Sequence, residues 1–403
     1  MKVLLITSAS APHIGGEEVY LEKLVPALEE RGIQVRVLVL STIKHITSNY
    51  TQDSQVSFIY VHNPYTYCGL FERNIISPSL YRKIRREIRT FTPDVVHLHT
   101  VFFLKTVLFA AYHIPKVQTF HEVSIILPLY PLFFAEDPNT DYVGELDFKK
   151  GKRIGLKYRT LFIDHYLLSD HRISKRITKL FLCPSNYLAD VAKKVGLTPT
   201  IHLPYFQDAD RAEVIHENKS DNEYFLFVGR LETIKGADQL LRAFSLLKKQ
   251  YEKARLIIAG DGTQSLELKL LSKKLGIDAH VDFLGWVDNS KLSVYYENAR
   301  GIIIPSIYPE VSPLVAFEAM RYNKPVIAYS VGGLPEIVQQ RETGLLVERG
   351  DIQGLSDACQ QIYTNPTYAQ QLGDAGRKYL EKHYTKKEHV DRLIAIYESL
   401  CKL

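Results

Sequence analysis

The sequence of 403 residues contains no apolar run of the roughly 18 residues that a membrane-spanning helix needs. The longest candidate, residues 124–135, is too short and includes two prolines. The first ten residues, MKVLLITSAS, carry one lysine and a short apolar stretch, which makes a poor secretory signal and a good β-strand. These absences predict a cytoplasmic protein.

Cysteine is also scarce. The four cysteines, Cys68, Cys183, Cys359 and Cys401, stand far apart and form no CxxC pair, which excludes a disulfide framework and a cysteine zinc site. With 22 Gly, 18 Pro and 24% charged residues, the chain is neither collagenous, low in complexity nor disordered. Its length predicts two or three domains, at about 150 residues each.

Positive charge is unevenly distributed. Residues 1–205 hold 25 Lys and Arg against 18 Asp and Glu, a net of +7, and the remainder holds 25 against 27, which gives the total of +5. Much of the excess lies in residues 82–89 and 149–159. One interpretation is solvated helix faces. The other is a surface that attracts anionic lipid headgroups or a phosphorylated acceptor. No nucleic-acid partner is expected, because no known reading module is present.

Strand and helix signals alternate in two series. The first predicts strands at 2–7, 34–40, 56–61, 93–99 and 116–120, and the second predicts strands at 224–228, 254–259, 281–284, 301–305 and 325–329. Alternation of this kind indicates parallel sheets with helical crossovers. The sequence therefore predicts two doubly wound α/β domains, 1–205 and 206–385, with a cleft between them. A C-terminal helix, 386–403, is expected to pack back on the first domain.

Ligands of such sheets bind beyond the carboxyl ends of the strands. The first strand–helix loop lacks G-x-G-x-x-G, but Gly15 and Gly16 let the backbone approach a ligand; a simple tight turn is the alternative. The loop at 229–236 is more informative. Arg230 and Lys235, bracketed by glycines, can converge on a diphosphate, although ordinary surface cations would also fit the pattern.

The segment 305–321 predicts a second anion site. We expect Ser312 to cap a helix whose first turn contains Pro313. The backbone N–H groups around Leu314 and Val315 would then be free to hold a phosphate. Pro313 itself has no N–H group, which leaves fewer donors for this purpose.

Two carboxylates flank this expected anion site. Glu310 follows a buried strand, and Glu318 stands in the second turn of the helix, with its side chain leaning towards the helix start. Carboxylates in these positions can accept hydrogen bonds from sugar hydroxyls. Alternatively, Glu318 is a helix-surface residue and Glu310 a charge that favours the helix N-terminus.

The spacing from Glu310 to Glu318 resembles the E-x7-E motif of retaining glycosyltransferases of family 4, whose two Rossmann-like domains form the GT-B fold. The resemblance covers nearly the whole chain. Its further motifs are Gly15-Gly16, VVHLH at 95–99, TFHE at 119–122, CPS at 183–185, VGR at 228–230 with Lys235-Gly236, AGDG at 259–262, PVIA at 325–328 and GGLPE at 332–336.

This resemblance implies a role for each matched residue. Arg230 and Lys235 would bind the diphosphate of a nucleotide sugar, Glu318 the ribose hydroxyls and Glu310 the donor sugar. Gly16 would approach the donor from the N-terminal domain, and His121 would hydrogen-bond the transferring sugar. The implied catalytic residues are His121, Glu310, Arg230 and Lys235. The implied donor-binding residues are Gly15, Gly16, Gly229, Arg230, Lys235, Gly262, Trp286, Val287, Glu310, Ser312, Leu314, Val315 and Glu318.

The resemblance also implies that neither a cofactor nor a metal is needed: Arg, Lys and helix N–H groups would carry the leaving-group charge, and the nucleotide sugar is a substrate. Asp208-Ala209-Asp210 matches a metal-binding DxD motif only superficially and is interpreted as a linker. His97 and His99 share one face of a strand, but without an evident third ligand we interpret them as packing and hydrogen-bonding residues.

The sequence therefore predicts a retaining glycosyltransferase that moves a sugar from a UDP- or GDP-linked donor to an acceptor hydroxyl in polysaccharide, glycolipid or other glycoconjugate synthesis. The acceptor would be a carbohydrate or a lipid-linked molecule, held by the basic N-terminal domain. Residues 123–159, apolar and then basic, suggest peripheral contact with an anionic membrane at its inner face. The alternatives are a catalytically silent sugar- or partner-binding subunit and a nucleotide-sugar epimerase on the same fold.

Overall fold

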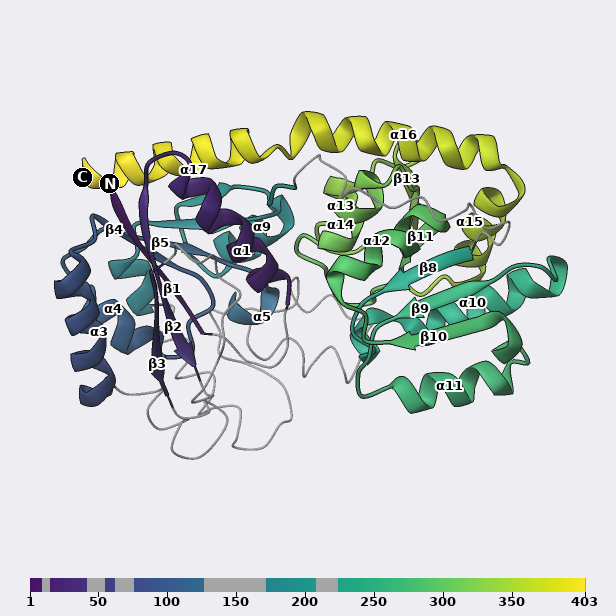
Figure 1. Ribbon diagram of the computed structural model, residues 1–403, viewed down its shortest axis with the longest axis horizontal. Coiled ribbons are helices and arrows are strands. Elements are labelled where there is room, and N and C mark those ends of the chain that lie inside the picture. Colours follow the sequence, from purple (N-terminus) through teal and green to yellow (C-terminus); the bar gives the residue numbers. More distant parts are fainter. Residues whose placement is uncertain (9–14, 42–54, 62–75, 127–171, 208–223, 403) are drawn as a thin grey trace. The chain divides into compact units, whose positions relative to one another are not determined.

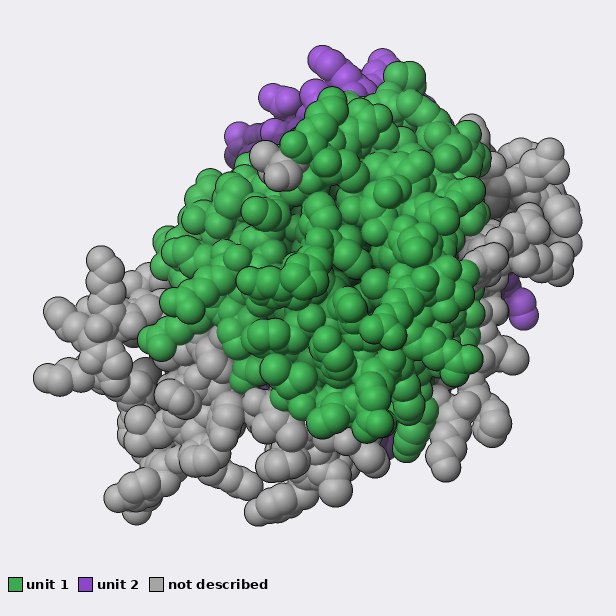
Figure 2. Space-filling model, turned by 90° about the vertical axis from the view of Figure 1, so that its left-hand side faces the viewer, with its two compact units in different colours: residues 1–133, 139–205, 386–403 green, residues 134–138, 206–385 purple. Residues whose placement is uncertain are grey.

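The computed structural model describes residues 1–8, 15–41, 55–61, 76–126, 172–207 and 224–402. The chain divides into two compact units, coloured green and purple in Figure 2. Unit 1 comprises residues 1–133, 139–205 and 386–403, and unit 2 comprises residues 134–138 and 206–385. Most of the segment expected to contact lipid, and the DxD match at 208–210, lie outside the described residues.

Unit 1 is built on a seven-stranded parallel sheet with the order β3-β2-β1-β4-β5-β6-β7 (Figure 1). The strand order reverses between β1 and β4, which are neighbours, and such a switch point is where ligands bind in open α/β sheets. The strands are β1 (Lys2–Thr7), β2 (Gln34–Ser41), β3 (Gln55–Tyr60), β4 (Val95–Leu98), β5 (Lys116–Thr119), β6 (Leu180–Cys183) and β7 (Thr200–His202).

The described helices of unit 1 cover the sheet with apolar faces. They are α1 (Gly16–Glu29), α3 (Pro78–Phe91), α4 (Leu104–Ala110), α5 (Val123–Ile126), α9 (Asn186–Lys194) and α17 (Lys386–Cys401). In α3, Leu80, Ile84, Ile88 and Phe91 recur at helical spacing and are buried. They pack in one cluster with residues of α4 and of strands β1, β2 and β4. Burial of each such side chain contributes about 1.5–3 kcal/mol to folding.

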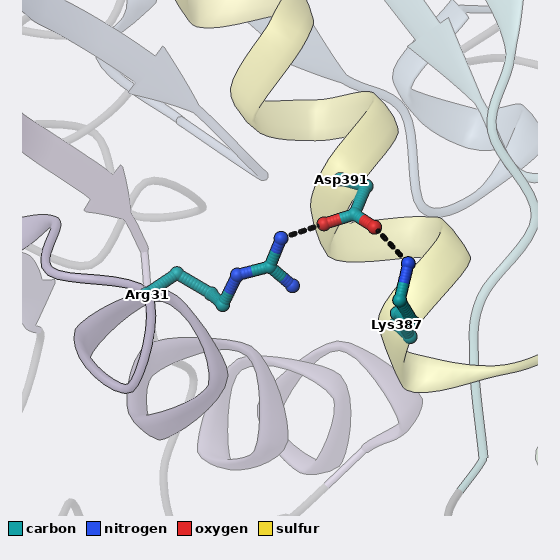
Figure 3. Close-up of polar contacts among 3 residues, drawn as sticks. All are labelled: Arg31, Lys387 and Asp391. Atoms are coloured by element: carbon teal, nitrogen blue, oxygen red, sulfur yellow. Dashed lines mark hydrogen bonds and ion pairs between the residues drawn. The ribbon is translucent and has the colours of Figure 1, made fainter.

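The C-terminal helix α17 belongs to unit 1 and contacts α1 and β4. Val390, Leu393 and Tyr397 form its buried face. At the surface, Arg31 at the end of the α1 segment forms an ion pair with Asp391, whose other carboxylate oxygen lies 2.9 Å from Nζ of Lys387 (Figure 3). Helix α17 is thus held by a buried apolar stripe with a small ion-pair network at its edge.

Unit 2 has a six-stranded parallel sheet with the order β10-β9-β8-β11-β12-β13. Its strands are β8 (Tyr224–Val228), β9 (Leu256–Ala259), β10 (Val281–Gly285), β11 (Ala299–Ile304), β12 (Val326–Tyr329) and β13 (Gly344–Val347). Its helices are α10 (Ala237–Gln250), α11 (Ser265–Lys274), α12 (Asn289–Asn298), α13 (Leu314–Arg321), α14 (Leu334–Ile337), α15 (Ile352–Thr364) and α16 (Pro366–His383), with 3-10 turns η1 (Thr233–Lys235) and η2 (Asp278–His280).

The predicted fold class is confirmed, since both units are doubly wound α/β layers around parallel sheets. The ten predicted strands are present with ends shifted by one or two residues. Strands β6, β7 and β13, together with helices α9, α15 and α16, were not predicted from the sequence. Among the described residues, no helix is both long enough and apolar enough to cross a membrane.

Candidate active site

The loops that follow β8 and β11 meet at the carboxyl edge of the unit 2 sheet. Because these two strands are neighbours, residues 229–236 and 305–313 leave the sheet side by side. Nζ of Lys235 lies 2.5 Å from Oε1 of Glu310. The same carboxylate oxygen accepts a hydrogen bond of 2.6 Å from Oγ of Ser306. The structure thus brings together two residues that are 75 positions apart and that the sequence placed in one site.

Glycines allow these loops to approach closely. Gly236 has φ +66°, and a Cβ there would lie 2.0 Å from the carbonyl oxygen of Pro305. A Cβ at Gly262 would lie 2.5 Å from the carbonyl oxygen of Leu231. The absence of a side chain at Gly236 and Gly262 therefore allows the loop that contains Arg230 and Lys235 to pack against the neighbouring loops.

Glu310 is ionised more readily than an ordinary glutamate. Its side chain is only 14% exposed, and burial by itself raises its pKa. The Lys235 ammonium, the hydrogen bond from Ser306 and the charge of Arg230 outweigh burial and lower the pKa of Glu310 below its usual value. Arg230 is itself exposed. The site therefore holds a fixed negative carboxylate beside two cations.

Helix α13 begins at Leu314, one residue later than the sequence suggested. The expected Ser312 cap is wrong: Pro313 is the N-cap, with an extended ψ of 117°, and no side chain caps the helix. Ser312 is one position too far away, and its buried hydroxyl has no hydrogen-bond partner among the described residues. The N–H groups of Leu314 and Val315 still stand at the open end of the helix, where no preceding turn can accept their hydrogen bonds.

Glu318 lies on the same helix and is oriented by an aromatic residue. Oε2 of Glu318 accepts a 2.5 Å hydrogen bond from the hydroxyl of Tyr296 on α12. Burial first, and then the Glu318 carboxylate, raise the pKa of Tyr296, so this hydroxyl remains a donor. Within the described residues, the other oxygen of Glu318 accepts no hydrogen bond and can take one from a ligand.

Trp286 and Val287 follow β10, which is an edge strand of this sheet. The indole of Trp286 is 71% exposed, and Val287 is half-buried. They lie at the same carboxyl edge as Lys235 and Glu310, but two strands away from β8. Among the described residues, no hydrogen bond, ion pair or ring contact joins Trp286 to that cluster.

A second group of polar residues gathers at the switch point of unit 1. Glu17 in the first turn of α1, His99 after β4 and His121 after β5 each place a ligand atom within 4.8 Å of the others. Glu17 accepts hydrogen bonds from Oγ1 of Thr7 at 2.6 Å and from the hydroxyl and N–H of Thr100. Burial nevertheless raises the pKa of Glu17.

His121 is enclosed in a chain of hydrogen bonds. Its Nδ1 lies 2.5 Å from the hydroxyl of Tyr205, and its Nε2 lies 2.8 Å from Nδ1 of His99. Burial lowers the pKa of His121 to about 3, so the imidazole is neutral at ordinary pH. Both nitrogens of His121 are therefore engaged, while Nε2 of His99 is buried and finds no hydrogen-bond partner in the described part of the chain. A sugar hydroxyl would reach His121 only by exchanging one of these bonds.

The two histidines of VVHLH have different surroundings. Nδ1 of His97 lies 2.6 Å from the hydroxyl of Tyr397 on α17, and Nε2 lies 2.7 Å from Oγ1 of Thr119. The interpretation of His97 as a packing and hydrogen-bonding residue is confirmed. His99, by contrast, does meet a third candidate ligand, Glu17, which the sequence argument did not find. A metal ion could bind this group only by replacing the His99–His121 hydrogen bond or by turning one of the rings.

Gly15 and Gly16 stand at the start of α1 and are both exposed. Gly15 is the N-cap and donates its N–H to Oε2 of Glu18 at 2.9 Å. Gly229 follows β8 and donates its N–H to the carbonyl of Ala259 at 3.0 Å. Sequence reasoning missed Glu17, Tyr205, Tyr296 and Ser306 as partners of the site residues. Of these, only Glu17 carried a signal, since it directly follows the glycine pair.

Comparison with known families agrees with this architecture. A family model described as Glycosyltransferase Family 4 matches residues 14–204, and one described as Glycosyl transferases group 1 matches residues 208–379. Each covers somewhat less than half of the chain, and each contains one of the residue groups described above. The chain belongs to the glycosyltransferases of the family 4 type, and its fold is GT-B.

Several known proteins match this chain, some over less than half of its length and one over most of it. An uncharacterised glycosyltransferase of Haemophilus influenzae is 32% identical over 170 residues, which are 42% of this chain and 47% of that protein. One from Methanocaldococcus jannaschii is 30% identical over 45% of this chain and 46% of its own length. The chain thus matches about half the length of these two relatives. An uncharacterised protein of a cps region in Klebsiella pneumoniae is 27% identical over 90% of this chain and 96% of its own.

Solved structures with the same fold extend over the whole chain. A sucrose-phosphate synthase from Thermosynechococcus elongatus gives a TM-score of 0.78 at 21% identity, covering 99% of this chain and 98% of that one. Anabaena HepE, solved in complex with UDP-glucose, gives 0.75 at 18% identity, covering 99% of this chain and 100% of that one. At these identities the likeness shows the fold alone.

Proposed function

We propose that this enzyme transfers a sugar, with retention of configuration, from a nucleotide diphosphate sugar to an acceptor hydroxyl. The observation that carries the proposal is the Lys235–Glu310 pair beside Arg230, at the carboxyl ends of two neighbouring strands. Arg230 and Lys235 follow β8 and can bind a leaving diphosphate. Glu310 follows the neighbouring strand β11 and can bind the sugar that is attached to this diphosphate.

Each part of the site has a role in this proposal. Arg230 and Lys235 neutralise the charge that develops on the diphosphate, a task for which we propose that no metal is needed. The N–H groups of Leu314 and Val315 hydrogen-bond phosphate oxygens at the start of α13. Glu318, fixed by Tyr296, accepts a hydrogen bond from the ribose.

Glu310 would accept a hydrogen bond from the donor sugar. Because Ser306 and Lys235 both engage Oε1, Oε2 is the oxygen left to face the sugar. A carboxylate held in one rotamer loses less side-chain entropy when the sugar binds. Lys235 thus serves the site twice, by attracting the diphosphate and by orienting Glu310.

The proposed chemical step needs no protein base. The acceptor oxygen forms a bond to the anomeric carbon on the face from which the diphosphate departs, and the bond from that carbon to the phosphate oxygen breaks. The acceptor proton passes to an oxygen of the leaving diphosphate. A neutral His121 could supply a hydrogen bond in this step but carries no charge. Anabaena HepE, which has been solved with UDP-glucose, supports a UDP-linked donor as the first to test.

The first test is thermal stabilisation by UDP, GDP, ADP and their sugar conjugates. Ligand at 100 times its dissociation constant should stabilise the native state by about 2.7 kcal/mol. One nucleotide should stabilise the wild type, and Arg230→Ala and Glu318→Gln should weaken the gain. Arg242→Ala, at an exposed position on α10, is the matched control and should behave as the wild type.

The donor identified in this way then allows a transfer assay. NMR of the glycoside product should show the same anomeric configuration as the donor. An inverted product would overturn retention, and conversion of the donor sugar without any acceptor would indicate an epimerase instead. Absence of stabilisation by all of the nucleotides would favour a catalytically silent subunit.

A further inference from the structure

Helix α3 carries a groove on the surface of unit 1 that the proposed chemistry does not use. Its lining residues all come from this helix: Tyr81, Arg82, Arg85, Arg86, Arg89 and Thr90. The four arginines follow the i, i+3, i+4, i+7 spacing that places side chains along one stripe of a helix. The opposite face of α3 is buried in the core. The helix thus separates an apolar inner face from an outer face that is rich in positive charge.

Like charges three and four positions apart destabilise a helix, so this stripe opposes folding of α3. The only acidic residue of the helix, Glu87, points elsewhere: it accepts a 3.1 Å hydrogen bond from Ser57 and lies 3.8 Å from Arg36. Within the described residues, no acidic side chain forms an ion pair with any arginine of the stripe. Among the described residues the charge of the stripe is thus not balanced by a carboxylate, and an anionic ligand can pair with it.

The end of α4, which carries two exposed aromatic residues, contacts one arginine of the stripe. Arg85 donates a 3.2 Å hydrogen bond to the carbonyl of Ala110 at the end of α4, which packs beside α3. On either side of Ala110, Phe109 is 37% exposed and Tyr112 is 56% exposed. Arginines and exposed aromatic residues on adjacent helices of one surface are a combination found where proteins meet the interfacial region of a membrane.

The arginine stripe extends along two turns of α3, the helix that connects strands β3 and β4. Because α3 connects the parallel strands β3 and β4, it runs from their carboxyl edge back towards their amino ends. Arg82 and Arg89 are about 10 Å apart along the helix axis, at 1.5 Å per residue. Unit 1 presents this side on the left of Figure 1 and towards the viewer in Figure 2. Arginines spread over two helical turns can contact several lipid headgroups in the plane of a membrane, whereas a single phosphate would contact only some of them.

We propose that the surface formed by the arginine stripe, Phe109 and Tyr112 binds a bilayer that contains anionic phospholipids. The guanidinium groups of Arg82, Arg86 and Arg89 contact lipid phosphates, and the two aromatic rings enter the interfacial layer. This inference deepens the proposed function, on which it rests only for the role of a lipid-linked acceptor. Vesicle binding itself is measurable without any catalysis.

The test is co-sedimentation of the full chain with vesicles of phosphatidylcholine alone or of phosphatidylcholine mixed equally with phosphatidylglycerol. The wild type should bind only the anionic vesicles, and added salt should weaken binding. The triple variant Arg82→Gln/Arg86→Gln/Arg89→Gln should bind about 100-fold more weakly, at about fivefold for each arginine near an anionic surface.

A matched control separates the stripe from net charge. Arg242→Gln/Lys249→Gln/Lys253→Gln removes the same charge from exposed positions of unit 2 and should bind anionic vesicles as the wild type does. Phe109→Ser/Tyr112→Ser, which keeps every arginine, should also weaken vesicle binding. Stabilisation by the donor nucleotide should persist in all of these variants, which shows that they are folded.

Several results would overturn the proposal. One is that the wild type does not bind anionic vesicles. Another is that the control triple variant loses as much vesicle affinity as the arginine variant. A third is that inorganic phosphate abolishes vesicle binding, which would indicate a single-phosphate ligand. Tighter binding to a single-stranded RNA oligonucleotide than to vesicles, lost in the arginine variant, would indicate nucleic acid instead. Vesicle binding without stabilisation by any nucleotide would leave this inference standing and the transferase proposal refuted, whereas the reverse pattern would refute only this inference.

Discussion

The hydroxyl of Tyr205 lies 2.5 Å from Nδ1 of His121, although the two residues are 84 positions apart. Their rings are also stacked, with centroids 5.8 Å apart and planes inclined by 24°. On the other side of the imidazole, His99 engages Nε2. His121 is therefore held at both nitrogens and over one ring face, so its orientation is set by Tyr205 and His99 together.

The Tyr205 hydroxyl should matter more for catalysis than for folding. Tyr205→Phe keeps the stacked ring but removes the bond to Nδ1, at a cost of about 1 kcal/mol in unfolding free energy. If His121 contacts the transferring sugar, the loosened imidazole should lower kcat about tenfold with little change in donor KM. Initial rates and a denaturant melt of the variant measure both effects.

The control for this variant is Tyr379→Phe, which removes a partly buried hydroxyl in unit 2 that contacts Gln339. It should lose a similar free energy of unfolding and keep its kcat. Equal kinetics in the two variants would mean that the Tyr205–His121 hydrogen bond has only a structural role.

Removal of the Lys235 ammonium should affect both donor binding and Glu310. Lys235→Gln takes away a charge-assisted hydrogen bond to the diphosphate, typically about 1.5–3 kcal/mol, so donor affinity should fall about 10- to 150-fold. The pKa of Glu310 should rise, because Lys235 is the leading influence that opposes the effect of burial. Isothermal titration with the donor nucleotide at two pH values measures the loss and its pH dependence.

Lys248→Gln on α10 provides the comparison for this experiment. It removes a lysine of the same unit whose ammonium bonds the backbone carbonyl of Glu252 instead of a carboxylate. Its donor affinity should remain that of the wild type. An unchanged affinity in Lys235→Gln itself would show that this lysine does not touch the diphosphate.

The convergence of Lys235 and Glu310 was predictable because each residue stands in the loop that follows a mainly apolar strand. Strands β8 and β11 have the composition of parallel strands buried on both faces, and their carboxyl ends share one edge of the sheet. Two short motifs at the ends of such strands therefore fix a site without any long-range information. The resemblance to a known family rests largely on these loops.

The surroundings of His121 were not predictable in the same way. Tyr205 reaches the imidazole only because β5, β6 and β7 lie side by side, and β6 and β7 are strands of four and three residues without a periodic signal. The Ser312 cap failed for a local reason. Pro313 adopts an extended ψ and itself becomes the N-cap, a choice that the fixed φ of proline leaves open.

Acid should destabilise unit 1 through its buried neutral histidines. Burial lowers the pKa of His121 to about 3 and of His389 to about 4, and it holds the pKa of His97 and of His99 well below the usual value of 6.5. Below pH 6.5 the unfolded chain binds more protons than the native state, so the free energy of unfolding falls as pH falls. The loss should continue down to about pH 4 to 3.

Denaturant melts at pH 7.5, 6.5 and 5.5 measure this slope. His389→Gln should reduce the slope, because one histidine that is neutral in the native state no longer takes up a proton on unfolding. His113→Gln, at an exposed position, is the control and should keep the wild-type slope. Equal slopes in the two variants would contradict the assignment of His389 as a buried neutral group.

Helix α17 should depend on its buried stripe and hardly at all on the ion pairs drawn in Figure 3. Asp391→Asn removes a surface carboxylate and with it the ion pairs to Arg31 and Lys387. Exposed ion pairs of this kind lose most of their Coulomb energy to solvent screening. The melting temperature of this variant should equal that of the wild type. Leu393→Ala on the same helix deletes a fully buried side chain and should cost about 2–5 kcal/mol.

The two variants distinguish ion pairing from apolar packing because both substitutions lie within one turn of the same helix. Calorimetry should show a lower melting temperature for Leu393→Ala alone, and fluorescence of the melt should show the same order. A larger decrease in melting temperature for Asp391→Asn than for Leu393→Ala would mean that the Arg31–Asp391–Lys387 network, and not apolar packing, holds the C-terminal helix in unit 1. The depth of burial of Val390, Leu393 and Tyr397 argues for packing.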